Sequence, residues 1–363
     1  MSVIQVTDLV KHFPVRGGVL NRVVGKVHAV NGVSFDIRRG ETVGIVGESG
    51  CGKSTLGKAL IRLHDPTSGS IRYDGREITG LSHHEMMEIR RKMQIIFQDP
   101  YSSLNPRLTI RAMLREAIRF HGVVPPAEMD DYITELIRTV GLRPDAAEKF
   151  PHEFSGGQRQ RIGIARALSV KPEFIIADEP VSALDVSIQA QVLNLMMDLK
   201  EQFGLTLMFI SHDLKVVEHF CDRVLVMYLG HVVEELPTDD LHARARHPYT
   251  RALLGANPID DPSERRPLTV LQGDVPSPFK PPTGCPFQTR CPRVHDRCRE
   301  SMPPLVDHGA EGAPEEVACY AVEEDLAAGL PIGSWSPEDG ARVAVTAGAD
   351  ADDAPADGDA ERS

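Results

Sequence analysis

The stretch Gly47–Ser54, GESGCGKS, follows the β-rich run Thr42–Val46 and precedes a helical pattern from about Lys53 to Leu63. This G-x-x-x-x-G-K-S spacing between a strand and a helix is typical of a P-loop in an α/β fold. Its glycines let backbone N–H groups close around phosphates, while Lys53 supplies a positive charge for the β- and γ-phosphates. The predicted nucleotide contacts in the loop are Gly47, Glu48, Ser49, Gly50, Cys51, Gly52, Lys53, Ser54 and Thr55.

An acidic pair ends the apolar run Phe174–Glu179, FIIADE. At the end of a buried strand, Asp178 can hold Mg²⁺ through water, together with the Ser54 hydroxyl. Glu179 follows and is placed to polarise an attacking water. The alternative is that the two acids only cap the end of the strand.

Two further polar residues also follow apolar runs. His212 ends Leu207–His212, LMFISH, and can reach a γ-phosphate, although a histidine in such a place is often structural. Gln98 follows Ile95–Phe97 and could sense Mg²⁺ and water, which makes it a third candidate metal contact. A lone glutamine carries little weight by its chemistry alone.

A second phosphate-binding helix start is predicted in Phe154–Leu168, FSGGQRQRIGIARAL. Ser155 and Gln158 form a capping-box pattern that opens a helix. Gly156 and Gly157 leave bare backbone N–H groups at its positive end, which suits a phosphate. One chain with two such sites and a single P-loop indicates a dimer that shares them.

Composition excludes several classes of protein. The 363 residues are 41% hydrophobic and 25% charged, as in a soluble globular protein. We find no signal segment at the start and no apolar run near the roughly 18 residues that span a bilayer, so any membrane role should be peripheral. From Glu323 onward there are eleven acids and two bases, a net of −9 of the total −12. The rest carries only −3, and no nucleic-acid-binding surface is indicated.

Periodicity divides the chain into a sheet region, a helical insertion and a second set of strands. Residues 1–40 alternate as antiparallel strands do, and Ser70–Tyr73 resembles a returning edge strand. Helices are predicted over Glu85–Met93, Ile110–Phe120 and Met129–Val140, and parallel strands over Phe174–Ala177, Leu205–Ile210 and Val224–Tyr228. The chain becomes Pro-rich and irregular past about Asp239, and we expect disorder after Pro331.

Four late cysteines, Cys285, Cys291, Cys298 and Cys319, are separated by five, six and twenty residues. Without a signal segment, a disulfide framework is not expected. The spacings lack the C-x₂-C pairs of most structural zinc sites. Four thiolates could hold a [4Fe–4S] cluster, which tolerates irregular loops. Zinc and reduced, packed thiols are the alternatives, and His295 has no special claim as a ligand.

Taken together, the motifs resemble those of ABC-type ATP-binding subunits over about residues 1–325. GESGCGKS, Gln98, FSGGQ, FIIADE, SALD (Ser182–Asp185) and His212 occur in that family's order and approximate spacing. The resemblance implies that two subunits close head to tail around two ATP molecules, each held by one P-loop and the partner's Ser155–Gln158. It places Asp185 at the seam.

The same resemblance implies roles for single residues. Glu179 would be the general base, His212 the γ-phosphate clamp and Gln98 a residue that faces the transmembrane partner. Phe13 resembles the aromatic that stacks on adenine, although it could equally be an ordinary strand residue. ATP and Mg²⁺ are the implied nucleotide and metal ion.

The subtype resembles dipeptide and oligopeptide importers, by KHFPV (residues 11–15), FQDPYSSLNPR (97–107), HPYTRALL (247–254) and GCPFQTRCP (284–292). Within that group the chain resembles the F-type ATPase. This implies a D-type paralogue, two transmembrane permease subunits, indirectly an extracytoplasmic solute-binding protein, and a place on the cytoplasmic face of a bacterial membrane. Some relatives carry an iron–sulfur cluster in this C-terminal element. Alternatives are import of nickel or a glycoside, or a soluble ABC ATPase in translation or DNA repair.

The predicted fold class is therefore an α/β P-loop ATPase core with an antiparallel β subdomain, a helical insertion and an irregular Cys-containing extension. The ATPase domain is expected over residues 1–238, with the helical subdomain at about 82–170. The transporter-type C-terminal region is expected over 239–325 and a disordered acidic tail over 326–363.

Overall fold

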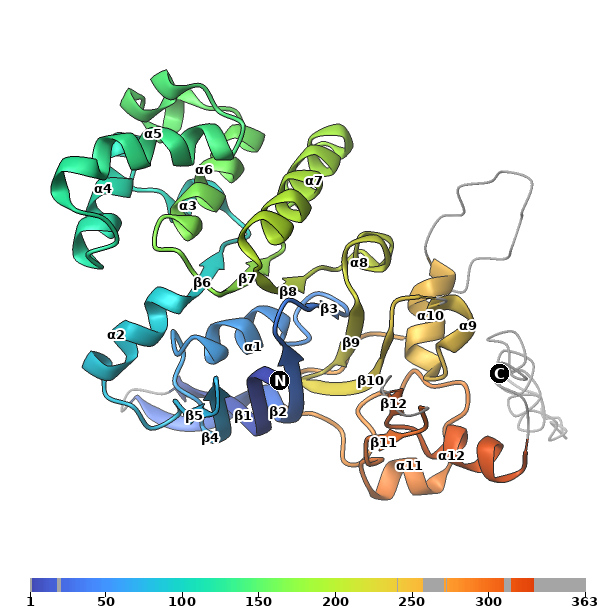
Figure 1. Cartoon of the computed structure of the whole chain (residues 1–363). Helices are drawn as coiled ribbons and strands as arrows, with labels where there is room; N and C mark the ends of the chain where they lie inside the picture. Colours follow the sequence, from blue (N-terminus) through green and yellow to red (C-terminus); the bar gives the residue numbers. More distant parts are fainter. Residues whose placement is uncertain are drawn as a thin grey trace, which may run out of the picture.

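Two β-sheets organise the chain in this computed structural model, which describes residues 2–17, 21–239, 241–256, 271, 273–309 and 315–329. The larger sheet has the strand order β11-β12-β10-β9-β3-β8-β7-β6, and the smaller has the order β2-β1-β4-β5. Figure 1 shows a helical lobe, α3 to α6, beyond the β6 edge and the C-terminal region at the opposite end. The predicted α/β class is confirmed.

The centre of the larger sheet is parallel, as its apolar runs predict. It contains β3 (Thr42–Val46), β6 (Met93–Ile96), β7 (Phe174–Asp178), β8 (Thr206–Ile210) and β9 (Arg223–Tyr228). Every residue of β3, β7, β8 and β9 is buried, which is typical of parallel strands covered on both faces. Their carboxyl ends lie at one edge, where the predicted site residues follow.

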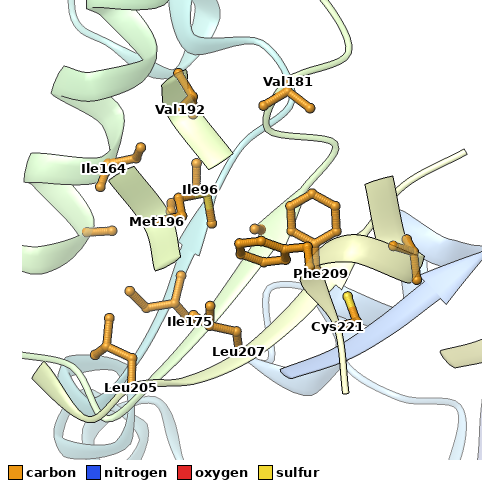
Figure 2. Close-up of a cluster of buried hydrophobic side chains, with 14 of the residues drawn as sticks. Ile96, Ile164, Ile175, Val181, Val192, Met196, Leu205, Leu207, Phe209 and Cys221 are labelled. Carbon is orange, nitrogen blue, oxygen red and sulfur yellow. The ribbon is translucent and has the colours of Figure 1, made fainter. Parts of the chain in front are cut away.

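Helices cover both faces of this sheet. On one face lies α1 (Lys53–Leu60), where a Cβ on Gly57 would lie 3.0 Å from Ile210 Cδ1, so the helix approaches the strands closely. On the other lie α6 (Gly156–Leu168) and α7 (Val186–Phe203). Figure 2 shows the second face, where Ile164 of α6 and Met196 of α7 lie over the strand residues Ile96, Ile175 and Leu207.

The smaller sheet is antiparallel, as predicted for residues 1–40. It contains β1 (Ser2–Gly17), β2 (Arg22–Arg38), β4 (Ser68–Tyr73) and the two-residue β5 (Arg76–Glu77). The strand predicted at Ser70–Tyr73 lies between β1 and β5 and is not at the edge, because β5 adds two more backbone pairs.

The helical lobe begins later than residue 82. After α2 (His83–Lys92), β6 pairs in parallel with β7 at the edge of the larger sheet, so the predicted range 82–170 includes one strand of the core. The lobe then comprises α3 (Pro100–Ser103), α4 (Ile110–Phe120), α5 (Met129–Thr139) and α6, with the short turns Pro126–Glu128, Pro144–Glu148 and Pro151–Glu153. The helix predicted over Ile110–Phe120 has these same bounds.

The C-terminal region is more regular than its composition predicts. After α8 (Leu214–Phe220) come β10 (His231–Pro237), α9 (Leu241–Arg244), α10 (Pro248–Ala256), α11 (Asp296–Glu300), β11 (Val306–Asp307), β12 (Glu316–Val317) and α12 (Tyr320–Ala327). Strand β12 pairs antiparallel with β10, which extends the larger sheet. The expected disordered tail falls mostly on residues 330–363, outside the described residues. Within the described part, none of the helices is long and apolar enough to cross a membrane.

Candidate active site

The P-loop lies between β3 and α1 and is closely packed against other backbone. Gly47, Gly50 and Gly52 have φ values of 150°, 80° and 109°. A Cβ on Gly47 would lie 2.1 Å from the Met227 carbonyl oxygen, and one on Gly52 the same distance from that of Ala29. The loop therefore needs glycine both for its left-handed turns and for its contact with the neighbouring strands.

Lys53 points back into the loop. Its side chain is 4% exposed, and Nζ donates hydrogen bonds to the carbonyl oxygens of Gly47, at 2.6 Å, and Glu48, at 3.1 Å. A buried ammonium without a counter-ion within the loop is costly, and an anionic phosphate would compensate its charge. The loop thus fits a polyphosphate ligand.

Ser54 and Asp178 meet opposite the loop, as the sequence predicts for magnesium contacts. The Ser54 hydroxyl donates to Asp178 Oδ1 at 2.6 Å, and Lys58 Nζ lies 4.0 Å from Oδ2. Burial raises the pKa of Asp178, which is 2% exposed, while the hydrogen bond from Ser54 opposes that shift. Two hard oxygen donors beside a phosphate site fit Mg²⁺, which usually takes only one or two protein ligands and completes its shell with phosphate and water.

Three predicted site residues converge, although Gln98 lies 81 positions before Glu179 and His212 lies 33 positions after it. Gln98 Nε2 donates to Glu179 Oε2 at 2.9 Å, and His212 Nδ1 lies 3.3 Å from the same oxygen. The three follow β6, β7 and β8, whose carboxyl ends are adjacent. Glu179 has a φ of 46°, and its N–H donates to the Ile210 carbonyl at 3.0 Å, which fixes the turn that presents the carboxylate.

The capping box at the start of α6 is present. The Gln158 N–H donates to Ser155 Oγ at 3.4 Å, and the Ser155 N–H donates to Gln158 Oε1 at 3.1 Å. Ser155, Gly156 and Gln158 are exposed. Among the described residues, no hydrogen bond or ion pair joins Ser155–Gln158 to Gly47–Thr55. The helix start that the sequence predicts as a second phosphate site therefore faces solvent within one chain.

Gly157 has a role that the sequence analysis missed. A Cβ at this position would lie 2.5 Å from Ile188 Cγ2 of α7. The glycine therefore allows close packing of α6 on α7, in addition to the phosphate-binding role that the sequence predicts for its N–H. Nearby, Asp185 precedes α7 without a side-chain cap bond, and Val186 is 82% exposed. This exposed surface is where the sequence predicts a dimer seam.

Phe13 lies on β1, half-buried, in the hairpin whose partner strand contacts Gly52 through Ala29. Its ring meets His64 edge-on at 5.3 Å, and Lys11 Nζ lies 4.8 Å above it. Stacking of Phe13 on adenine stays a prediction.

The four late cysteines are free thiols, three of them buried and Cys291 half-buried. Burial raises the pKa of Cys285 to about 11 and those of Cys291 and Cys319 to about 12, with the neighbouring thiols adding to the shift. Within the described ranges, no group of three or more His, Cys, Asp or Glu side chains is placed to hold a metal ion. The predicted cluster ligands are thus near one another but are not arranged as a metal centre.

Glu48 has two contacts that the sequence did not indicate. Arg290 forms an ion pair with its carboxylate, and Tyr249 accepts a hydrogen bond from its N–H. Tyr249 lies in HPYTRALL and Arg290 in GCPFQTRCP, two motifs that in the sequence indicate only a subtype. No local pattern links them to the P-loop.

The P-loop, the exposed capping-box helix and the three convergent residues on a parallel sheet define an ABC-type ATPase. Residues 30–182 match the family described as ABC transporter, and residues 233–298 match the family described as oligopeptide/dipeptide transporter, C-terminal region. These matches, together with the relatives described in the next paragraph, show that the chain belongs to the ABC transporter family, among the ATP-binding subunits that carry this C-terminal region. ATP hydrolysis coupled to transport is the activity of that family, with ATP and Mg²⁺ as nucleotide and metal ion.

Curated relatives and solved structures agree with this assignment. The chain is 51% identical to the oligopeptide transport ATP-binding protein AppF of Bacillus subtilis, over 88% of this chain and 97% of that protein. It is 53% identical to the probable peptide ABC transporter ATP-binding protein y4tS of Sinorhizobium fredii, over 84% and 86%. It is also similar to the dimeric, post-hydrolysis ATP-binding cassette MJ0796 bound to ADP and Pi, with a TM-score of 0.57 and 30% identity over 65% of this chain and 98% of that one.

Replacing Glu179 by glutamine tests its predicted role as the general base. Glu179→Gln keeps the shape and the hydrogen bond with Gln98 but cannot accept a proton, so we expect phosphate release to fall by about 100-fold or more. ATP binding, measured with a fluorescent analogue, should be retained. The matched control is Glu201→Gln on the exposed side of α7. Near-normal hydrolysis by Glu179→Gln would remove Glu179 from this role.

Proposed function

We propose that the chain hydrolyses ATP to power the import of dipeptides or oligopeptides through a membrane permease complex. One observation carries the proposal of ATP hydrolysis: Gln98 and His212 both contact Glu179 Oε2, at the edge of the sheet that also holds the P-loop. The match of residues 233–298 to the oligopeptide/dipeptide transporter C-terminal region, and the names of the relatives, support a peptide as the solute.

In the proposed chemistry the chain positions water and stabilises charge, without covalent catalysis. The Glu179 carboxylate accepts a proton from the attacking water, and Gln98 holds that carboxylate in place. His212, 3.3 Å from the same carboxylate, is the proposed clamp of the γ-phosphate. The loop N–H groups and Lys53 balance the negative charge of the phosphates. Ser54, Asp178 and Gln98 are the proposed contacts of Mg²⁺, which when bound neutralises charge on the β- and γ-phosphates.

The site is proposed to be completed by a second ATPase subunit. Ser155–Gln158 lie on the surface of α6 and are not joined to the P-loop of their own chain. The dimeric state of the similar cassette MJ0796 supports the pairing of two subunits. In the proposed head-to-tail arrangement, Asp185 and the exposed Val186 lie at the seam. A D-type paralogue is the proposed partner, and each composite site would then contain residues of both chains.

Ser155→Arg tests this sharing. A bulky cation at the start of α6 should leave ATP binding by the isolated chain within about twofold, while hydrolysis by the assembled complex falls by about 100-fold, as when a preorganised donor is lost. Ser82→Arg is the matched control, because Ser82 forms the same kind of capping box at α2. Normal hydrolysis by the Ser155→Arg complex would contradict the shared site.

Co-purification from membranes tests the transport assignment. The chain, isolated with mild detergent from its native host, should bring with it two permease subunits, a second ATPase and, indirectly, a peptide-binding protein. That outcome would also support a place on the cytoplasmic face of the membrane. A nickel- or glycoside-binding protein in the complex would keep the ATPase role and change the solute. Ribosomes or DNA in its place would overturn the transport assignment.

A [4Fe–4S] cluster on Cys285, Cys291, Cys298 and Cys319 is a separate proposal. Its support is the resemblance to relatives that carry one, together with the electrostatic contact of Cys291 with the other three thiols, which adds to the effect of burial on its pKa. We expect an anaerobic preparation to absorb near 400 nm and to contain about four iron atoms per chain. Absence of both iron and the band would leave buried, reduced thiols as the function of this set.

A further inference from the structure

The P-loop is joined to the C-terminal region by a bidentate ion pair. Arg290 Nη1 lies 2.6 Å from Glu48 Oε2, and Nη2 lies 3.0 Å from Oε1. The Arg290 side chain is 6% exposed and that of Glu48 is 26% exposed. Paired N–H donors on a carboxylate make a strong and directional contact, and burial of the arginine limits its screening by salt.

A second contact holds the backbone of the same residue. The Glu48 N–H donates to Tyr249 Oη at 2.8 Å, and Tyr249 of α10 is fully buried. Both the main chain and the side chain of Glu48 are therefore held by residues from the C-terminal region. The Glu48 carbonyl in turn accepts a hydrogen bond from Lys53 at 3.1 Å, so a single hydrogen bond connects the residue held by these contacts with the predicted phosphate-binding lysine.

Both contacts originate from one rigid aromatic cluster. The rings of Tyr228, Tyr249 and Phe287 lie 4.8, 5.2 and 5.4 Å apart in pairs, and all three residues are buried. Arg290 follows Phe287 on a tight turn, in which its N–H donates to the Phe287 carbonyl at 3.0 Å. The guanidinium also lies 3.4 Å from Tyr228 Oη. Little freedom is left for Arg290 to move away from Glu48.

We propose that Arg290, assisted by Tyr249, is a positioning residue that holds the P-loop in its ATP-binding conformation through Glu48. Without this contact the P-loop is less ordered before ATP binds, so part of the binding free energy is used to order it. The loop N–H groups contact the phosphates in the bound state and in the transition state alike. Loss of the contact therefore weakens binding uniformly, which raises KM and leaves kcat nearly unchanged. The proposal rests on the assignment of Gly47–Thr55 as the ATP site.

Arg290→Ala in the assembled complex tests the proposal. We expect the KM for ATP, and the Kd of a fluorescent ATP analogue, to rise roughly tenfold, with kcat at saturating ATP within about twofold. Arg290→Lys keeps one charged donor and should restore part of the affinity. Tyr249→Phe removes a single oxygen and should shift KM in the same direction. If Arg290→Ala does not fold, the KM values of Tyr249→Phe and Arg290→Lys test the proposal in its place.

Arg293→Ala is the matched control, because Arg293 pairs with Asp325 within the same region. It should leave the KM for ATP unchanged. If Arg290 acts through Glu48, the two changes should not be additive. The double variant Glu48→Gln with Arg290→Ala should raise the KM for ATP by less than the product of the two single fold-changes. Additive effects, an unchanged KM in Arg290→Ala and Tyr249→Phe, or an equal shift in Arg293→Ala would overturn the proposal. Lys53→Ala tests the ATP site separately from the role of Arg290. Normal ATP binding by that variant would refute the assignment of Gly47–Thr55 as the ATP site.

Discussion

The parallel alignment of β3, β6, β7 and β8 is the constraint on which the rest of this structure depends. Because their carboxyl ends lie at one edge, residues that are far apart in the chain become neighbours there. Lys53 and Ser54 follow β3, Gln98 follows β6, and Glu179 and His212 follow β7 and β8. The helices on both faces keep these strands dry, so the polar groups can meet only at the strand ends.

Charge at that edge is balanced only in part by the chain itself. Lys53 is buried with carbonyl partners, and Asp178 is buried with a hydroxyl and a more distant lysine. An anionic nucleotide and a divalent cation complement these groups with opposite signs. The exposed start of α6 adds backbone donors that the same chain does not use at its own P-loop. In the proposed dimer, a nucleotide between two subunits would satisfy both sets of groups, and ATP binding would then favour association.

Much of this site could be predicted because its motifs are local. A P-loop needs glycines, a lysine and a serine within eight residues, and Phe174–Glu179 combines an apolar strand with its terminal acids. Strand β3 and helix α4 have the predicted bounds because the residue pattern that predicts each of them is also local to the segment. Strand β6 has only four residues, too few to show a period, so the sequence predicts this stretch as part of the helical segment. The two-residue β12 lies in an irregular stretch and is defined by its pairing with β10 and β11.

The sequence by itself determined the chemistry of the nucleotide site and the family, because these depend on residue types at short, regular spacings. Only the tertiary structure decided which distant residues support that site. The requirement for Gly157 comes from Ile188 on the next helix, and the contact between Arg290 and Glu48 spans most of the chain. Such contacts form when separate elements pack together, and no periodicity or local spacing encodes which partners will meet.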